Sequence, residues 1–158
     1  MPSLSPGTPG AKEAYGISVI RDDYSICIPS KALKRYNISN NDLVLLTSTR
    51  KGEGGLAILN YEKARQSVFN EIIRKIKDIN LLVYERSRPY ALTTVSNERI
   101  FLNQEFIDAF NLKTGDKLLV IKSTTVSMSF SPVEIWKEKF RKRGFLDAIR
   151  NLDKLELY

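Results

Sequence analysis

One segment of this chain occurs twice, and this duplication is the feature that most constrains its fold. Residues 26–46, ICIPSKALKRYNISNNDLVLL, align without a gap on residues 100–120, IFLNQEFIDAFNLKTGDKLLV, at an offset of 74 positions that carries Asp42 onto Asp116. Apolar residues coincide at nearly every aligned position, and the turn residues coincide as well. Such self-similarity at a fixed spacing is typical of a repeated structural unit. We therefore expect two copies of one unit.

Each copy has the pattern of two strands, a short helix and two further strands. The strands are short runs of β-branched, aromatic and aliphatic residues bounded by polar turns. Ser30 and Asn103 are expected to cap the N-termini of the short helices, and Asn37 and Asn111, which tolerate positive φ, are expected to end them. The expected strands are 17–20, 25–28, 43–47 and 56–59 in the first copy and 91–95, 99–102, 117–122 and 126–130 in the second.

A longer helix is expected after each copy. Residues 61–79 place apolar side chains four positions apart, which predicts one amphipathic helix of five turns. The second helix is expected to begin at Ser131-Pro132, with the serine as its cap, and to break at Gly144 before a further helical piece over 145–152. Residues 86–89 mark the junction between the copies.

The fold class expected from this pattern is mainly β with short helices (α+β). A β-β-α-β-β unit of this size cannot bury both faces of its strands alone, whereas two tandem units can close around a shared core. The expected organisation is a flexible tail over 1–14, which is rich in Pro, Gly and Ser, a first repeat with its trailing helix over 15–80, a second over 90–145 and a C-terminal helical extension over 146–158.

Composition narrows the classes of function. The chain has 25 Lys and Arg against 18 Asp and Glu, a formal charge of +7, and nucleic acid is the commonest partner for such a surplus, followed by an anionic membrane or an acidic protein. With no histidine and one cysteine, the usual zinc sites and Cys/His nucleophilic sites cannot be assembled. No carboxylate pair suggests acid–base chemistry. We expect no enzyme activity, no cofactor and no metal.

The remaining sequence signals concern location. Cys27 lies between two isoleucines in an expected strand, which predicts a small buried side chain. A lone cysteine allows no internal disulfide, which suits a reducing cytosol. No stretch approaches 18 apolar residues and the N-terminal segment lacks a signal-peptide core, so neither a membrane span nor secretion is expected. The expected location is the cytoplasm.

The motifs within the two copies resemble a known family. Ile28-Pro29, Ile38 and Asp42 in the first copy, and Arg99, Leu102, Leu112 and Gly115-Asp116 in the second, follow a pattern similar to that of the AbrB/MazE/MraZ (SpoVT-AbrB) group. Two copies in one chain, each trailed by a helix, look most like MraZ. The segment Pro132-Val133-Glu134-Ile135-Trp136 is similar to the helix start that follows the MraZ barrel. The resemblance covers residues 15–145.

The resemblance implies a swapped-hairpin (double-split) β-barrel that regulates transcription by binding double-stranded DNA, in the cytoplasm and associated with the nucleoid. In this family, arginines on paired hairpins contact DNA with help from basic residues on the short helix. The family arginine falls on Arg99 in the second copy but on Ser25 in the first. The basic helix pair falls on Leu33 and Lys34 in the first copy, and on Ile107 and Asp108 in the second. The candidate DNA-binding residues are Arg21, Lys31, Lys34, Arg35, Arg50, Lys51 and Arg99.

Other interpretations of these residues and of the fold stay open. The basic residues of the short helix are either phosphate contacts or a solvated helix face, Arg21 is a phosphate contact or a salt-bridged turn residue, and Arg50-Lys51 is a groove-entering hairpin tip or edge protection. The alternative function is an antitoxin-like module, or a degenerate barrel that serves as a scaffold for a protein partner or for oligomerisation. The trailing helices are where copies of the chain would join into a homo-oligomer.

Overall fold

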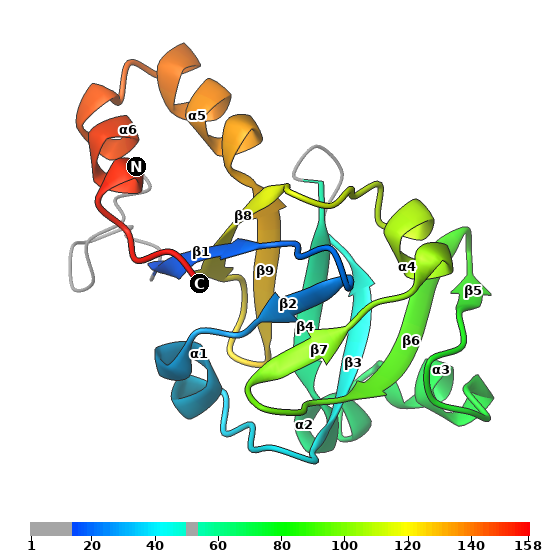
Figure 1. Cartoon of the computed structure of the whole chain (residues 1–158). Coiled ribbons are helices and arrows are strands. Elements are labelled where there is room, and N and C mark those ends of the chain that lie inside the picture. Colours follow the sequence, from blue (N-terminus) through cyan, green and yellow to red (C-terminus); the bar gives the residue numbers. More distant parts are fainter. Residues whose placement is uncertain (1–13, 50–53) are drawn as a thin grey trace.

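The computed structural model describes residues 14–49 and 54–158, and the fold is mainly β with several short helices (Figure 1). The strands are β1 (Ala14–Val19), β2 (Ser25–Cys27), β3 (Leu43–Ser48), β4 (Leu56–Asn60), β5 (Val83–Glu85), β6 (Arg88–Thr94), β7 (Arg99–Phe101), β8 (Lys117–Lys122) and β9 (Ser127–Pro132). The helices are α1 (Ser30–Arg35), α2 (Tyr61–Arg65), α3 (Asn70–Lys75), α4 (Gln104–Ala109), α5 (Val133–Lys142) and α6 (Leu146–Asp153).

Strands from the two halves of the chain are interleaved. Within the described residues, seven strands form an antiparallel sheet in the order β1-β8-β9-β4-β3-β6-β5, and β2 pairs with β7 in a separate ribbon. The first strand of each half pairs with the third strand of the other half, because β1 lies beside β8 and β6 lies beside β3. The two halves therefore fold together around one sheet instead of forming separate domains.

The main hydrophobic core lies between the β2–β7 ribbon and the sheet. Alternation along the ribbon turns Ile26, Ile28, Ile100 and Leu102 inward, and all four are buried. The short helices α1 and α4 close the core at its two sides through buried side chains three apart, such as Leu33 and Tyr36 on α1. Figure 1 looks onto the ribbon, with α1 and α4 at its opposite ends.

Two smaller clusters cover the outer face of the sheet. Trp136 and Phe140 of α5, together with Leu152 of α6, pack on β1 and β8. Ile72 and Ile73 of α3, together with Ala64 of α2, pack on β3, β4 and β6. Each trailing helical segment thus buries the outer face of the strands beside it. Residues 156–158 continue from α6 along the edge of β1, where Ile17 N donates to Glu156 O at 2.9 Å.

The helix expected over 61–79 is wrong in its length. Residues 61–75 form two short helices with a break at 66–69, and Val68, expected on the apolar face, is 87% exposed. Ser67 explains the break, because its hydroxyl donates to Ala64 O at 2.6 Å and accepts from Phe69 N at 3.2 Å. A serine that bonds to the local backbone in this way competes with helix continuation.

The expected junction at residues 86–89 is part of a β-hairpin. Arg86 and Ser87 both have positive φ, 51° and 67°, and connect β5 to β6 as a two-residue turn. No strand is expected over the residues of β5. The structure also starts β6 at Arg88, three residues before the strand expected over 91–95.

Helix ends follow the expectations in part. Asn103 caps α4, since its side chain accepts from Phe106 N at 2.9 Å, and Asn37 and Asn111 follow the short helices with φ of 54° and 55°. Ser30 does not cap α1, because Pro29 occupies the cap position and no side-chain bond is made. Ser131 and Pro132 lie in β9, so α5 begins at Val133; the break at Gly144, with φ of 74°, is confirmed.

Candidate nucleic-acid interface

The outward face of the β2–β7 ribbon presents Cys27, Arg99 and Phe101, whereas Ser25, on the same face, is covered and buried. The register places Cys27 opposite Arg99 and Ser25 opposite Phe101. Because side chains alternate along a strand, these four share the face turned away from the isoleucine core. Arg99 is half-buried and Phe101 is 47% exposed, so the ribbon offers a cation and an aromatic ring side by side. Cys27 is half-buried, which corrects the expectation of a buried thiol.

Helix α1 joins the ribbon at the end where Arg99 lies. Ile28 N, just before α1, donates to Glu98 O at 2.8 Å, and Glu98 lies one residue before Arg99. Lys31, Lys34 and Arg35 are all exposed and occupy one face of α1, because positions three and four apart are neighbours on a helix. The structure thus brings four candidate residues, Arg99 and the three on α1, to one end of the ribbon.

One acid lies within this basic group. Glu98 is exposed, and its carboxylate accepts from the Ser30 hydroxyl at 3.4 Å at the start of α1. Its backbone N–H is held by the side chain of Asn40 at 2.9 Å, so the turn before β7 is fixed against the loop that follows α1. With three basic side chains on α1 and Arg99 on β7, the end of the ribbon still has a surplus of positive charge.

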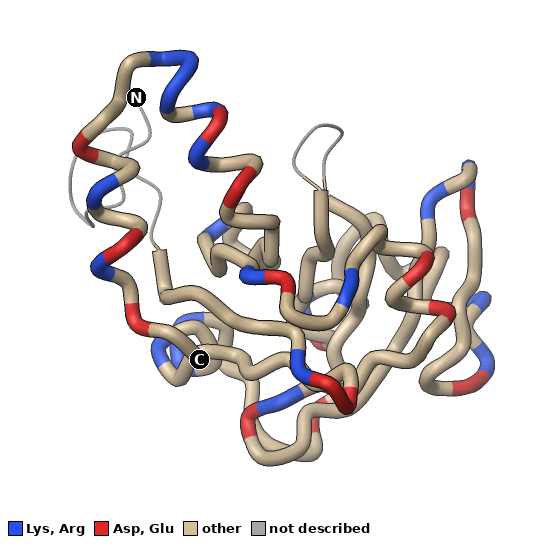
Figure 2. Tube along the Cα trace, turned by 45° about the horizontal axis from the view of Figure 1, so that its top comes forward, with Lys and Arg blue, Asp and Glu red and all other residues tan. Residues whose placement is uncertain are grey.

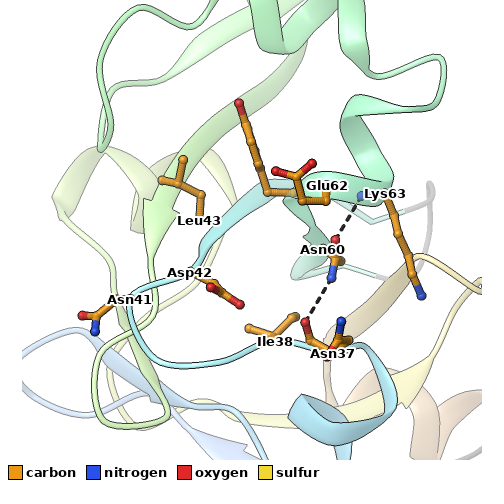
Figure 3. Close-up of a pocket in the computed structure, with 9 residues that line it drawn as sticks. Asn37, Ile38, Asn41, Asp42, Leu43, Asn60, Glu62 and Lys63 are labelled. Carbon is orange, nitrogen blue, oxygen red and sulfur yellow. Dashed lines mark hydrogen bonds between the residues drawn. The ribbon is translucent and has the colours of Figure 1, made fainter.

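Asn60 fixes the orientation of α1. Its amide nitrogen donates to the carbonyl oxygens of Tyr36 at 2.8 Å and Asn37 at 3.2 Å, where α1 ends. Its side-chain oxygen accepts from Lys63 N at 3.0 Å and so caps α2. Figure 3 shows the bonds of Asn60 to Asn37 and Lys63 beside an open groove between the α1–β3 loop and α2. Asp42, which also lines the groove, accepts from Ser39 N at 2.8 Å and holds its own turn. These groups serve to position α1.

Arg21 lies at the other end of the ribbon. It follows β1 in a turn whose Tyr24 O accepts from Leu102 N at 3.0 Å, beyond the end of β7. The Tyr24 hydroxyl donates to Gln104 of α4 at 2.6 Å. The structure therefore does not group Arg21 with the basic residues of α1. Its neighbours are the exposed carboxylates of Asp22 and Asp23 and the acidic face of α4.

Asp23 is held in its charged form. Hydrogen bonding to Ser25 lowers the pKa of its carboxyl, and the charge of Arg99 lowers it further. The Ser25 amide lies 2.9 Å from the carboxylate oxygen. The carboxylate therefore stabilises the turn, and the positive charge of Arg99, on the facing strand, attracts it.

The densest basic run of the sequence, in α5, does not extend this surface. Lys137 lies near both Glu134 and Asp153, at 3.8 and 3.9 Å, and Arg141 is paired with Glu138 at 2.6 Å. Lys139 stacks over the Trp136 ring at 4.9 Å. Figure 2 shows these alternating charges along α5, away from the ribbon. The cluster is largely balanced by acids of the same helical hairpin.

Two candidates cannot be placed, and one contributor was missed. Arg50 and Lys51 lie outside the described residues. Phe101 was not among the sequence candidates, although alternation from Arg99 through the inward-facing Ile100 would have put it on the same face. The alternation of side chains along β7 is thus the sequence feature that identifies Phe101.

No protein-family model and no curated protein matches this chain. The solution structure of PHS018 from Pyrococcus horikoshii is similar over 76% of this chain and 92% of that chain, with 12% sequence identity and a TM-score of 0.36. A likeness at this level supports no argument on function. Among the described residues, no helix has the length and apolar character that crossing a membrane requires.

Proposed function

We propose that this chain is a DNA-binding transcriptional regulator of the AbrB/MraZ type, with a swapped-hairpin barrel built from two tandem repeats. The observation that carries the proposal is the grouping of the exposed Lys31, Lys34 and Arg35 of α1 with the half-buried Arg99 of β7 at one end of the β2–β7 ribbon. Clustered lysine and arginine side chains on one face are the electrostatic footprint of a phosphate-binding surface. The sequence resemblance aligns Arg99 with the family arginine, which supports the proposal.

Matching hydrogen bonds in the two halves support the repeat. Ile28 N donates to Glu98 O, and Leu102 N donates to Tyr24 O, so both donors and both acceptors are 74 positions apart. Tyr24 and Glu98 also share positive φ, 64° and 61°. The ribbon pairs Ile26 with Ile100, its own counterpart at the same offset. These correspondences are what a two-fold exchange of hairpins between repeats requires.

A further pair of turns repeats the same geometry. Ser39 N donates to the Asp42 carboxylate at 2.8 Å, and Lys113 N donates to the Asp116 carboxylate at 3.0 Å. Asn41, in the first turn, has φ of 73°, and Gly115, in the second, has φ of 86°. Positive φ at both positions explains why the sequence has asparagine in one and glycine in the other. The aligned turn residues thus have aligned backbone roles.

The test of DNA binding is a salt titration. With four cations on the surface, binding to a mixed-sequence duplex should weaken as salt rises, with a log–log slope of about 3 to 4, since each neutralised phosphate contributes about 0.9. Lys31→Gln/Lys34→Gln should lower that slope by about 2. The matched control is Lys142→Gln/Arg143→Gln, which removes the same charge from the C-terminal end of α5 and should have little effect. An absence of binding at low salt would refute the proposal.

The second candidate function is a scaffold for protein interaction or oligomerisation, and the open edge of the sheet favours it. Residues 156–158 cover the outer edge of β1, whereas β5, at the other edge, has no such cover among the described residues. Leu81 and Tyr84 beside this edge are 51% and 58% exposed. Exposed apolar side chains at an uncovered strand edge favour pairing with another chain.

Mass in solution separates the two functions. A scaffold should give a light-scattering mass above that of one chain, and Leu81→Ser/Tyr84→Ser should reduce that mass to the monomer without changing DNA affinity. If the protein is monomeric and the double variant behaves like the wild type, the open edge is not an assembly surface.

A further inference from the structure

Helices α1 and α4 occupy equivalent places but carry opposite charge. At the offset of 74 positions, Lys31 corresponds to Glu105 and Lys34 corresponds to Asp108. All four side chains are exposed, on the faces opposite the buried core residues of their helices. Figure 2 shows the basic residues on α1 and the acidic residues on α4. The fold therefore presents one cationic and one anionic helix.

The two helices lie at opposite ends of the ribbon because its strands are antiparallel. Helix α1 follows β2, α4 follows β7, and β2 and β7 run in opposite directions. The first two views agree that α1 and α4 are on opposite sides of the ribbon (Figures 1 and 2). A duplex laid along the ribbon would meet positive charge at one end and negative charge at the other.

Hydrogen bonds hold the acidic side chains at the α4 end of the ribbon in place. The Tyr24 hydroxyl donates to the Gln104 side chain at 2.6 Å, and the Gln104 amide donates to the Asp108 carboxylate at 2.9 Å. Asp22 and Asp23 extend the negative charge onto the neighbouring turn. In the turn after α4, the backbone N–H of Lys113 donates to the Asp116 carboxylate at 3.0 Å, and the Lys113 side chain is exposed. Arg21 lies in the turn with Asp22 and Asp23, but the carboxylates at this end outnumber it, so the end of the ribbon near α4 keeps a negative charge.

We propose that duplex DNA is held over the α1 half of the ribbon only, and that the acidic α4 half keeps phosphates away, so that each chain covers an asymmetric site. This inference rests on the proposed function. DNA has one negative charge per about 1.7 Å of helix axis, so carboxylates placed against its backbone oppose binding. A protein with two equal halves covers a site with matching two-fold symmetry. Here the single chain gives the two halves different charges, and the covered site loses that symmetry.

The experiment replaces the acidic residues of α4 with lysines, so that α4 becomes positively charged like α1. Glu105→Lys/Asp108→Lys should bind a mixed-sequence duplex at least about tenfold more tightly in moderate salt, steepen the salt slope by up to about 2 and lengthen the hydroxyl-radical footprint on one side. The matched control is Glu71→Lys/Asp147→Lys, which makes the same charge change on α3 and α6, away from the ribbon. That control should leave the footprint length unchanged.

The possible outcomes distinguish one-sided binding from DNA binding itself. If the wild type binds no DNA at low salt, the proposed function itself fails. If the wild type binds with a steep salt dependence but the α4 variant leaves affinity and footprint unchanged, or if the α3/α6 control tightens binding equally, one-sided binding is overturned while DNA binding stands. A longer footprint for the α4 variant alone supports the inference.

Discussion

Cys27 and Arg99 lie directly opposite each other on β2 and β7, on the face of the ribbon that points away from the core. The pairing joins residues far apart in the sequence and puts an arginine beside the start of α1. Glu98 adjoins Arg99 and contacts Ser30 at the first position of that helix. This single register therefore decides which basic residues can act together.

Replacing Arg99 tests the centre of the proposed surface. Arg99→Ala should weaken duplex binding about tenfold and lower the salt slope by about 1, because one cation is removed from the contact. Fluorescence anisotropy at several salt concentrations measures both. The control is Arg150→Ala on α6, a largely exposed arginine near Asp147, which should change neither. Equal losses in the two variants would contradict a role specific to Arg99.

The lone cysteine reports on the same face without any substitution. Cys27 is half-buried and adjacent to Arg99, so a duplex lying on the ribbon should slow its alkylation by a maleimide several-fold. Mass spectrometry of samples taken over time, with and without DNA, follows the modified fraction. Raising the salt until DNA dissociates should restore the rate. Unchanged alkylation under saturating DNA would show that the duplex lies elsewhere.

Much of the fold could be predicted from the sequence because local chemistry decides it. Asn103 caps α4 and Asn37 ends α1 as expected, since capping and positive φ depend on a few neighbouring residues. The break at Gly144 follows for the same reason. The prediction of one long helix after β4 is wrong because it rests on apolar spacing alone. The hydroxyl of Ser67 bonds to the local backbone and ends α2.

The candidate site could be predicted only in its parts. The helical period of 3.6 residues places Lys31 and Lys34 on the polar face of a helix, and this depends on local sequence alone. Their grouping with Arg99, and the separation of Arg21 from them, depend on the antiparallel register of two strands that are distant in the sequence. No local pattern contains that register. The acidic character of α4 was visible in Asp108, but its position opposite α1 required the structure.

Asn60 is predicted to be the residue on which the position of α1 most depends. Asn60→Ala should lower the free energy of unfolding by about 2–3 kcal/mol, because it removes the cap of α2 and leaves the carbonyls at the end of α1 without their buried donor. Urea denaturation measures the loss. Asn103→Ala, which removes the cap of α4, should cost about 1 kcal/mol.

The two asparagine variants should also differ in local stability. Amide hydrogen exchange in α1 should accelerate in Asn60→Ala more than in Asn103→Ala, because only Asn60 bonds to the end of α1. Equal protection of α1 in both variants would contradict the positioning role given to Asn60.

Gly55 is predicted to tolerate no side chain, since its backbone lies against the neighbouring strand β9. It has φ of 80°, and a Cβ there would clash with the backbone carbonyl oxygen of Phe130 in β9. Gly144 has a similar φ of 74° but nothing within 4 Å of the added atom. Gly144→Ala should therefore cost about 1–2 kcal/mol, the price of the left-handed backbone alone. Gly55→Ala should cost about 3 kcal/mol or more, because β9 or the hairpin must also move. Thermal unfolding of the two variants measures the difference, and equal losses would show that the hairpin can shift away from β9 without strain.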